Sequence, residues 1–128
     1  MNEDSMIYDE KEAINAVIED GLNLRYVANQ TEKVCMYAVI NDPTSLQFVR
    51  KQTPVICINA ILGDVLALMY VRDQTVGLCK IAIREDWCAL KYVNNQTDEI
   101  CIMAIKQNKK AIQFVKDPTP EILELANK

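Results

Sequence analysis

A period of 22 residues runs through this chain and limits what it can fold into more than any other feature. Thr closes each period and an Asp or Asn stands at its middle; these residues are Thr31, Thr53, Thr75, Thr97 and Thr119, and Asp20, Asp42, Asp64, Asp86 and Asn108. A segment of this length cannot bury its own apolar side chains, so tandem copies must stack against one another. The period therefore predicts one repeat domain over residues 10–128, preceded by a polar lead-in at 1–9.

Every repeat carries two runs of apolar residues with helical spacing. We number the positions from one, beginning at residue 10, so that the repeats cover 10–31, 32–53, 54–75, 76–97 and 98–119, with a half repeat at 120–128. Positions three, four, seven and eight form one helical face, and positions fourteen, fifteen, seventeen and eighteen form a second. We expect two short helices of about nine residues per repeat. The predicted fold class is all-α, a right-handed α-solenoid of five 22-residue helical hairpins plus a C-terminal half repeat.

The polar residues at fixed positions have structural explanations. Thr at position 22 and Asp or Asn at position eleven are predicted N-caps, and Pro54 and Pro120 suit the first position of a helix. A Gln precedes the Thr in four repeats, at Gln30, Gln52, Gln74 and Gln96. A polar ligand groove is one interpretation of these glutamines. We favour hydrogen bonds between repeats, because Pro118 replaces the Gln where the array ends.

The chain has five cysteines and no histidine. Four of the cysteines share position four, namely Cys35, Cys57, Cys79 and Cys101. Helices in neighbouring layers lie about 8–10 Å apart, too far for a disulfide or a zinc site, so we expect buried, reduced thiols. The absence of histidine and of a Gly-rich phosphate loop argues against an enzyme, and we expect no metal and no cofactor.

The acidic start of the chain lacks the basic residues and apolar run of a secretory signal, and no run approaches the ~18 apolar residues of a membrane span. We therefore expect an intracellular, cytoplasmic protein with no membrane partner, either a monomer or a small homo-oligomer. Self-assembly through end-to-end contacts is a further possibility, which the polar Glu124 and Asn127 of the half repeat disfavour.

Two segments carry a family resemblance. Cys57-Ile-Asn-Ala-Ile followed by Ala67-Leu-Met-Tyr-Val, and Cys101-Ile-Met-Ala-Ile followed by Ala111-Ile-Gln-Phe-Val, resemble a family of short helical repeats of unknown function that occurs in giant viruses and bacteria. The resemblance covers residues 10–128. It implies a repeat scaffold in a viral or phage context, with a host cell as the location if the protein is viral, and it assigns no functional residue.

The positions that open the second helix vary between repeats and suggest a binding surface. The central repeats are apolar there, and the predicted partner-binding residues are Val65, Leu66, Met69, Trp87 and Cys88. Trp87 is the only tryptophan, a residue type that anchors interfaces. Partial burial by loop packing is the alternative. We interpret the chain as a protein–protein interaction module, a scaffold or adaptor, with inhibition of a host enzyme or defence complex as one form suggested by the resemblance.

Basic residues recur late in the second half of the repeats. Those expected on the later turns of the second helices are Arg25, Arg50, Lys51, Arg72, Lys91 and Lys116. Such a ridge could follow a phosphate backbone or an acidic protein segment. Cations also favour helix C-termini because of the helix dipole. A nucleic-acid-binding solenoid is therefore the alternative function.

Overall fold

The computed structural model describes residues 5–128 and consists of α-helices alternating with 3-10 helices, labelled η. It divides into two compact units that meet between Arg72 and Asp73. The first unit contains α1 (Glu10–Glu19), η2 (Gly21–Tyr26), α2 (Glu32–Asn41), η3 (Pro43–Phe48), α3 (Pro54–Gly63) and η4 (Val65–Tyr70). The second contains α4 (Val76–Glu85), η5 (Trp87–Tyr92), α5 (Asp98–Gln107), η6 (Lys109–Phe114) and α6 (Pro120–Asn127).

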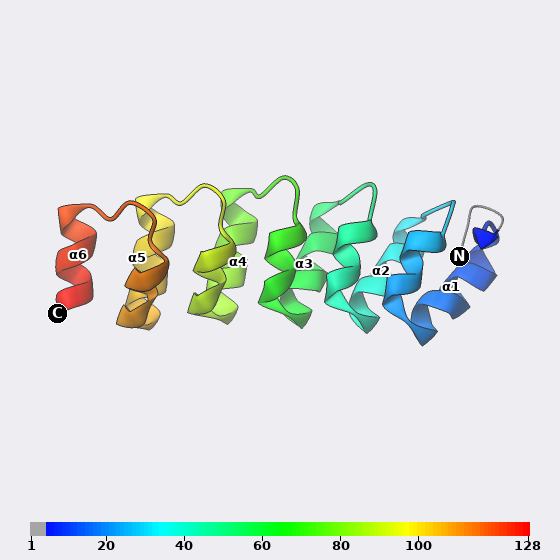
Figure 1. Ribbon diagram of the computed structural model, residues 1–128, viewed down its shortest axis with the longest axis horizontal. Coiled ribbons are helices and arrows are strands. Elements are labelled where there is room, and N and C mark those ends of the chain that lie inside the picture. Colours follow the sequence, from blue (N-terminus) through cyan, green and yellow to red (C-terminus); the bar gives the residue numbers. More distant parts are fainter. Residues whose placement is uncertain (1–4) are drawn as a thin grey trace. The chain divides into compact units, whose positions relative to one another are not determined.

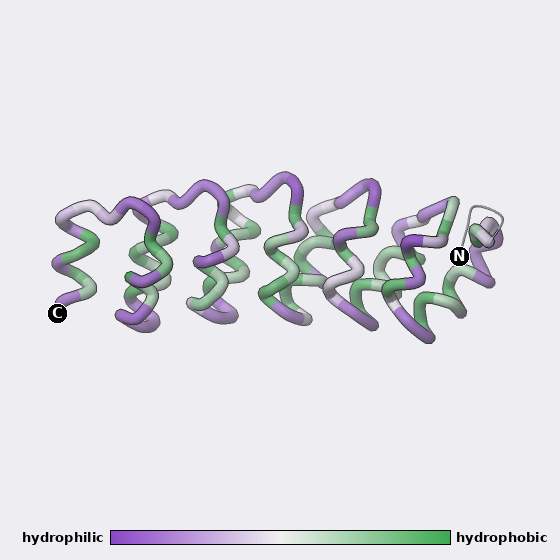
Figure 2. Tube along the Cα trace, viewed as in Figure 1, coloured by the Kyte–Doolittle hydropathy of each residue, from purple (hydrophilic) through white to green (hydrophobic). Residues whose placement is uncertain are grey.

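Each unit is built in two layers. Within a unit, successive α-helices pack side by side and the 3-10 helices line up next to them in a second layer (Figure 1). Hydrophobic residues concentrate on the helices, and hydrophilic residues concentrate in the loops that join a 3-10 helix to the next α-helix (Figure 2). The only β-type pairing within residues 5–128 is one isolated bridge, so the all-α prediction is confirmed.

The second helix of each repeat differs from the expectation. It is a 3-10 helix of six residues, not an α-helix of about nine. Bonds join residues three apart, such as Val71 N to Leu68 O at 3.1 Å. A 3-10 helix has three residues per turn, so positions fourteen and seventeen, and fifteen and eighteen, lie above one another. The apolar residues of the second run are already spaced three apart in the sequence. The run is too short, however, to distinguish a 3-10 helix from an α-helix.

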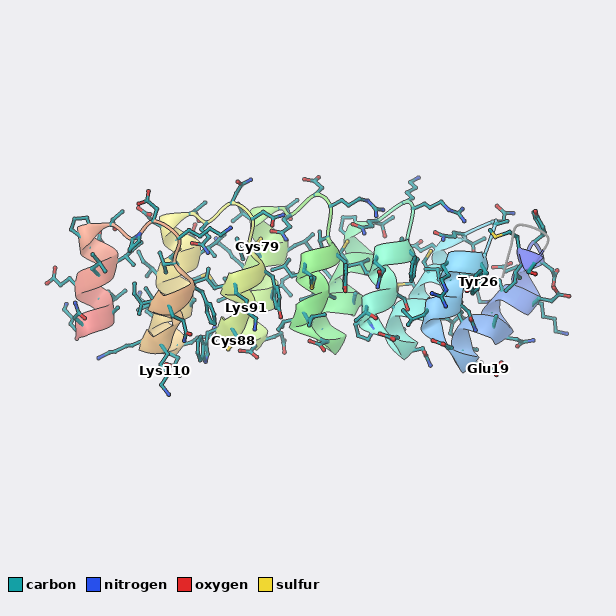
Figure 3. All side chains as sticks on the ribbon, in the orientation of Figure 1. Glu19, Tyr26, Cys79, Cys88, Lys91 and Lys110 are labelled. Carbon is teal, nitrogen blue, oxygen red and sulfur yellow. The ribbon has the colours of Figure 1, made fainter. Side chains whose placement is uncertain are left out.

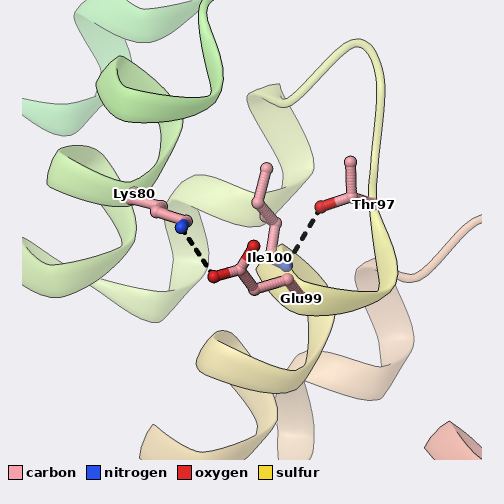
Figure 4. A network of polar contacts seen from close by, with 4 residues as sticks. All are labelled: Lys80, Thr97, Glu99 and Ile100. Carbon is pink, nitrogen blue, oxygen red and sulfur yellow. Dashed lines mark hydrogen bonds and ion pairs between the residues drawn. The ribbon is translucent and has the colours of Figure 1, made fainter.

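The predicted caps are confirmed. Thr53 Oγ1 accepts a hydrogen bond from Ile56 N at 3.3 Å, and Asp64 Oδ1 accepts one from Leu66 N at 2.9 Å. The same cap at Thr97 stands beside the ion pair of Lys80 Nζ with Glu99 Oε1, 2.6 Å long, which joins α4 to α5 (Figure 4). These acids and threonines therefore define where helices begin.

The Gln that precedes the closing Thr clamps each of the first four repeats to the next. Gln52 Nε2 donates to Leu46 O at 3.1 Å within its own repeat and to Tyr70 O at 2.9 Å in the next. Gln52 Oε1 accepts from Arg72 N at 3.0 Å. The equivalent bonds to the next repeat are made by Gln30, Gln74 and Gln96. The predicted hydrogen bonds between repeats are thus confirmed, and each clamp lies within one unit.

The position-four cysteines are free and buried, as predicted. Burial desolvates the thiolate and raises the pKa of Cys35 to about 11, so the thiol is neutral at pH 7. Its Sγ lies 3.7 Å from Gln30 Oε1, a weak hydrogen bond to the clamp. The cysteines therefore act as small apolar side chains with one polar contact.

The predicted lead-in is partly engaged with the first repeat. Residues 1–4 lie outside the described residues. Ile7 N donates to Tyr26 O at 2.7 Å, and Ala28 N donates to Ile7 O at 2.8 Å, which forms the isolated bridge between Ile7 and Val27. Asp9 then caps α1 through Glu12 N. Residues 7–9 thus belong to the packed first unit.

We expect Gln52→Ala to lower the free energy of unfolding by about 1–3 kcal/mol, because three backbone groups lose their partner at a half-buried site. Gln47→Ala is the matched control, since Gln47 bonds only Thr44 O in its own exposed turn and its loss should cost less than about 0.5 kcal/mol. Urea unfolding followed by circular dichroism measures both. Equal stability of the two variants would contradict the clamp.

Candidate interaction surface

The 3-10 layer differs in chemistry from the α-helical layer. Positions twelve to eighteen contain no Asp or Glu in any repeat; these segments are 21–27, 43–49, 65–71, 87–93 and 109–115. They hold six of the eight aromatic residues of the chain. Acidic residues instead lie on the α-helices, at the caps and in the loops. The 3-10 segments are therefore aromatic and contain no acid themselves, although an Asp caps the start of each 3-10 helix except η6, which Asn108 caps.

In the first unit, the structure places three of the predicted partner-binding residues on η4. Met69 is 50% exposed, whereas Val65 and Leu66 are half-buried. Leu66 N is held by the Asp64 cap at 2.9 Å. The expected exposed apolar patch is thus reduced here to Met69 and the outer edges of two half-buried side chains.

In the second unit, Trp87 and Cys88 open η5 and are also half-buried. The Trp87 ring packs on Phe114 of η6, with centroids 6.1 Å apart and planes tilted by 33°. Trp87 is therefore partly buried, as the alternative to a free patch expected, but the contact is made by a 3-10 helix of the next repeat and not by a loop. Trp87 and Cys88 belong to the second unit, whereas the three predicted residues on η4 belong to the first.

Two of the predicted ridge residues lie on 3-10 helices and cover aromatic rings. The Arg25 guanidinium is 4.8 Å from the Tyr26 ring centroid. Lys91 Nζ is 5.2 Å from the centroid of Tyr92 and 5.8 Å from that of Phe114. These are cation–π contacts, and they hold the two cations on the 3-10 layer.

The other ridge residues are not on helices. Those in the loops after the 3-10 helices are Arg50, Lys51, Arg72 and Lys116. Arg50 Nη1 donates to Ala28 O at 2.9 Å, and Arg72 Nη2 donates to Arg50 O at 3.0 Å. Lys116 Nζ reaches Val93 O at 3.4 Å. Placing these four on the later turns of the second helices was wrong, and three of them brace the loop of the preceding repeat.

A group of lysines that the sequence analysis did not single out as a site lies at the corner between α5 and η6. We call Lys106, Lys109 and Lys110 the basic corner. All three are exposed, and their side chains make no hydrogen bond or ion pair within residues 5–128. Lys110 points away from the ribbon (Figure 3). The sequence feature that could have indicated this group is Asn108, which caps η6 where the other repeats have Asp.

The position of Lys109 and Lys110 works against local stability. They are the first two residues of η6, where the helix dipole favours negative charge and disfavours cations. The neutral Asn108 cap gives them no compensating carboxylate.

The α-helical layer of the first unit carries an apolar row that sequence reasoning also missed. Ile18, Ile40 and Leu62 share position nine and are 51%, 64% and 53% exposed. Beside Ile40, a shallow hollow of about 480 Å³ is lined by Glu32, Lys33, Met36, Tyr37, Ile40 and Val55. Position nine lies outside the four positions that form the core face of the first helix. The recurrence of Ile or Leu at this position could have indicated the exposed row.

A second kind of hollow recurs at the loop edge. It measures about 440 Å³ beside Gln30 and Arg50, and about 220 Å³ at the equivalent place beside Gln96 and Lys116. Glu32 and Asp98 line the two hollows at equivalent repeat positions, whereas the first hollow has the cation Lys51 where the second has the carboxylate of Asp117. The hollow therefore recurs with the repeat, and its charge differs from one repeat to another.

Neither a metal site nor a membrane span is found among residues 5–128. No three side chains of Cys, Asp or Glu there come together in a way that could hold a metal ion. The helices described are all too short or too polar to cross a bilayer.

We expect a thiol reagent to label Cys88 first in the native protein, because the other four cysteines are buried. Burial and the nearby Asp86 carboxylate raise the pKa of the Cys88 thiol, so labelling should accelerate as the pH rises beyond the usual range of a cysteine. Mass spectrometry of the modified peptides measures this order. Equal rates for all five cysteines would show that the repeats open together.

We expect the double variant Lys109→Glu/Lys110→Glu to raise the free energy of unfolding by about 0.3–1 kcal/mol, because acidic residues suit the start of a helix. Lys91→Glu is the opposite control: Lys91 lies in the last turn of η5 and over two rings, so its replacement should destabilise. Thermal unfolding compares the variants. A less stable double variant would mean that the lysines support the fold.

Comparisons with protein-family models, curated proteins and solved structures gave no match to this chain. The resemblance to the short helical repeats of giant viruses and bacteria stays a prediction. The function must therefore be argued from the surfaces described above.

Proposed function

We propose that this chain is a non-catalytic protein–protein interaction module, built as a right-handed α-solenoid of five 22-residue hairpins plus a C-terminal half repeat. Its partner binds the 3-10 layer. The observation that supports this most is the pair of exposed lysines that opens η6, because Lys109 and Lys110 occupy positions where they oppose the helix dipole. A cost in stability without a structural return is typical of a binding site.

The second unit offers the elements of an interface. Trp87 is half-buried against Phe114, so its ring is already oriented and loses little freedom when a partner covers it. Lys91 is held over Phe114 and supplies a fixed charge beside the rings. In the first unit, Met69 is the corresponding exposed contact on η4.

Nucleic-acid binding is less well supported. Three of the six ridge cations donate to loop carbonyls, and two lie over rings. A continuous basic track, the usual sign of a backbone-binding surface, would require these groups to face outward together. The ring faces that Arg25 and Lys91 cover are also less available for stacking on bases.

A random peptide library displayed on phage tests the proposal. Peptides selected on the wild-type protein should lose at least about tenfold in affinity to Trp87→Asp, since the substitution removes the aromatic anchor and adds an acid. Lys33→Glu, on the exposed side of α2, is the matched control and should bind normally. Circular dichroism verifies that Trp87→Asp keeps its helices. Selected peptides that bind Trp87→Asp and the wild type equally would refute this surface.

A further inference from the structure

We propose that the partner presents an acidic segment, rich in Asp and Glu with interspersed apolar residues, to the 3-10 layer of the second unit. This inference rests on the proposed function and names the chemistry of its partner. The segment would lie across η5 and η6, with its carboxylates on Lys91 and the basic corner and its apolar side chains on Trp87.

Charge complementarity carries the first step. Segments 87–93 and 109–115 contain three lysines and no acid, and the carboxylate that directly precedes the first of them is Asp86, which caps η5 by accepting from Cys88 N at 2.9 Å. In the same unit, Lys80 on the α-helical layer is neutralised by Glu99 at 2.6 Å. No such partner is found for Lys91, Lys109 or Lys110 within the described part of the chain, so the 3-10 layer keeps its positive charge for an outside carboxylate.

The aromatic contacts carry the second step. Phe114 links the cation to the anchor, because its ring lies 5.8 Å from Lys91 Nζ and 6.1 Å from the Trp87 ring centroid. Lys109 and Lys110 begin the same 3-10 helix on which Phe114 ends. Lys109 and Lys110 therefore place positive charge at the start of η6, and Lys91 places it at the end. The Trp87 and Phe114 rings lie at that same end. A segment that alternates carboxylates with apolar side chains matches this arrangement.

A protein segment fits better than a nucleic acid. The Phe114 ring is already flanked by Trp87 and Lys91, which limits base stacking. Residues 73–128 carry eight acidic and eight basic residues, so the unit has no net positive charge to attract a polyanion from a distance. Within the unit, segments 87–93 and 109–115 are positively charged because they hold three lysines and no acid.

Fluorescence anisotropy with defined peptides tests the inference on the full chain. The probe is a labelled peptide of alternating Glu and Leu with one Phe, compared with its Gln analogue and with a labelled oligothymidylate. We expect the acidic peptide to bind at least about tenfold more tightly than the Gln analogue, and its affinity to fall as salt rises. Chemical-shift changes should map to residues 87–93 and 106–115.

The variants separate binding from folding. Lys109→Glu/Lys110→Glu should weaken the acidic peptide by at least about tenfold while the protein stays folded, and Lys33→Glu should have no effect. Equal affinity for the Gln analogue, or tighter binding of the oligothymidylate, would overturn the acidic-segment proposal. If the Gln analogue binds equally well but peptides from the random library still bind the 3-10 layer, the proposed function stands without the acidic segment. If no library peptide binds that layer, both proposals fail.

Discussion

The hydrogen bonds of one glutamine side chain in each of the first four repeats hold successive repeats in register. Gln52 bonds Leu46 O in its own repeat and Tyr70 O and Arg72 N in the next, so a single amide fixes where two loops meet. Backbone groups at loop edges otherwise depend on water or capping side chains. The same Gln recurs in the first four repeats, and the alanine at position seven is buried in the second to fifth repeats, where a larger side chain would disturb the close packing.

The short 3-10 helices determine which residues are left for binding. With three residues per turn, the buried positions fifteen and eighteen occupy one side, and positions twelve, thirteen and sixteen face away from the α-helical layer or lie at its edge. Apart from the buried Gly21, the residues at these positions are half-buried or exposed, and they differ between repeats: Val65 and Leu66 in one, Trp87 and Cys88 in another, and Lys109 and Lys110 in a third. A regular core thus supports an irregular surface.

The candidate site was only partly visible from sequence. Trp87 and Lys91 departed from the repeat pattern and were predicted, yet their contacts with Phe114 depend on how η5 packs on η6. Arg50 and Arg72 looked like surface cations, and the structure shows them bracing loops. The basic corner was missed because the sequence alone did not show that Lys109 and Lys110 form the first turn of η6. The Asn108 cap determines where that helix begins.

Sequence by itself determined the helical class, the 22-residue period, the caps, the buried thiols and the role of the glutamines, because each of these depends on contacts that recur at fixed spacing along the chain. Tertiary structure decided that the second helices are 3-10, that Trp87 is covered by Phe114, and which cations remain unpaired. Helix type and side-chain pairing depend on neighbouring repeats, whose distance and orientation no local pattern encodes.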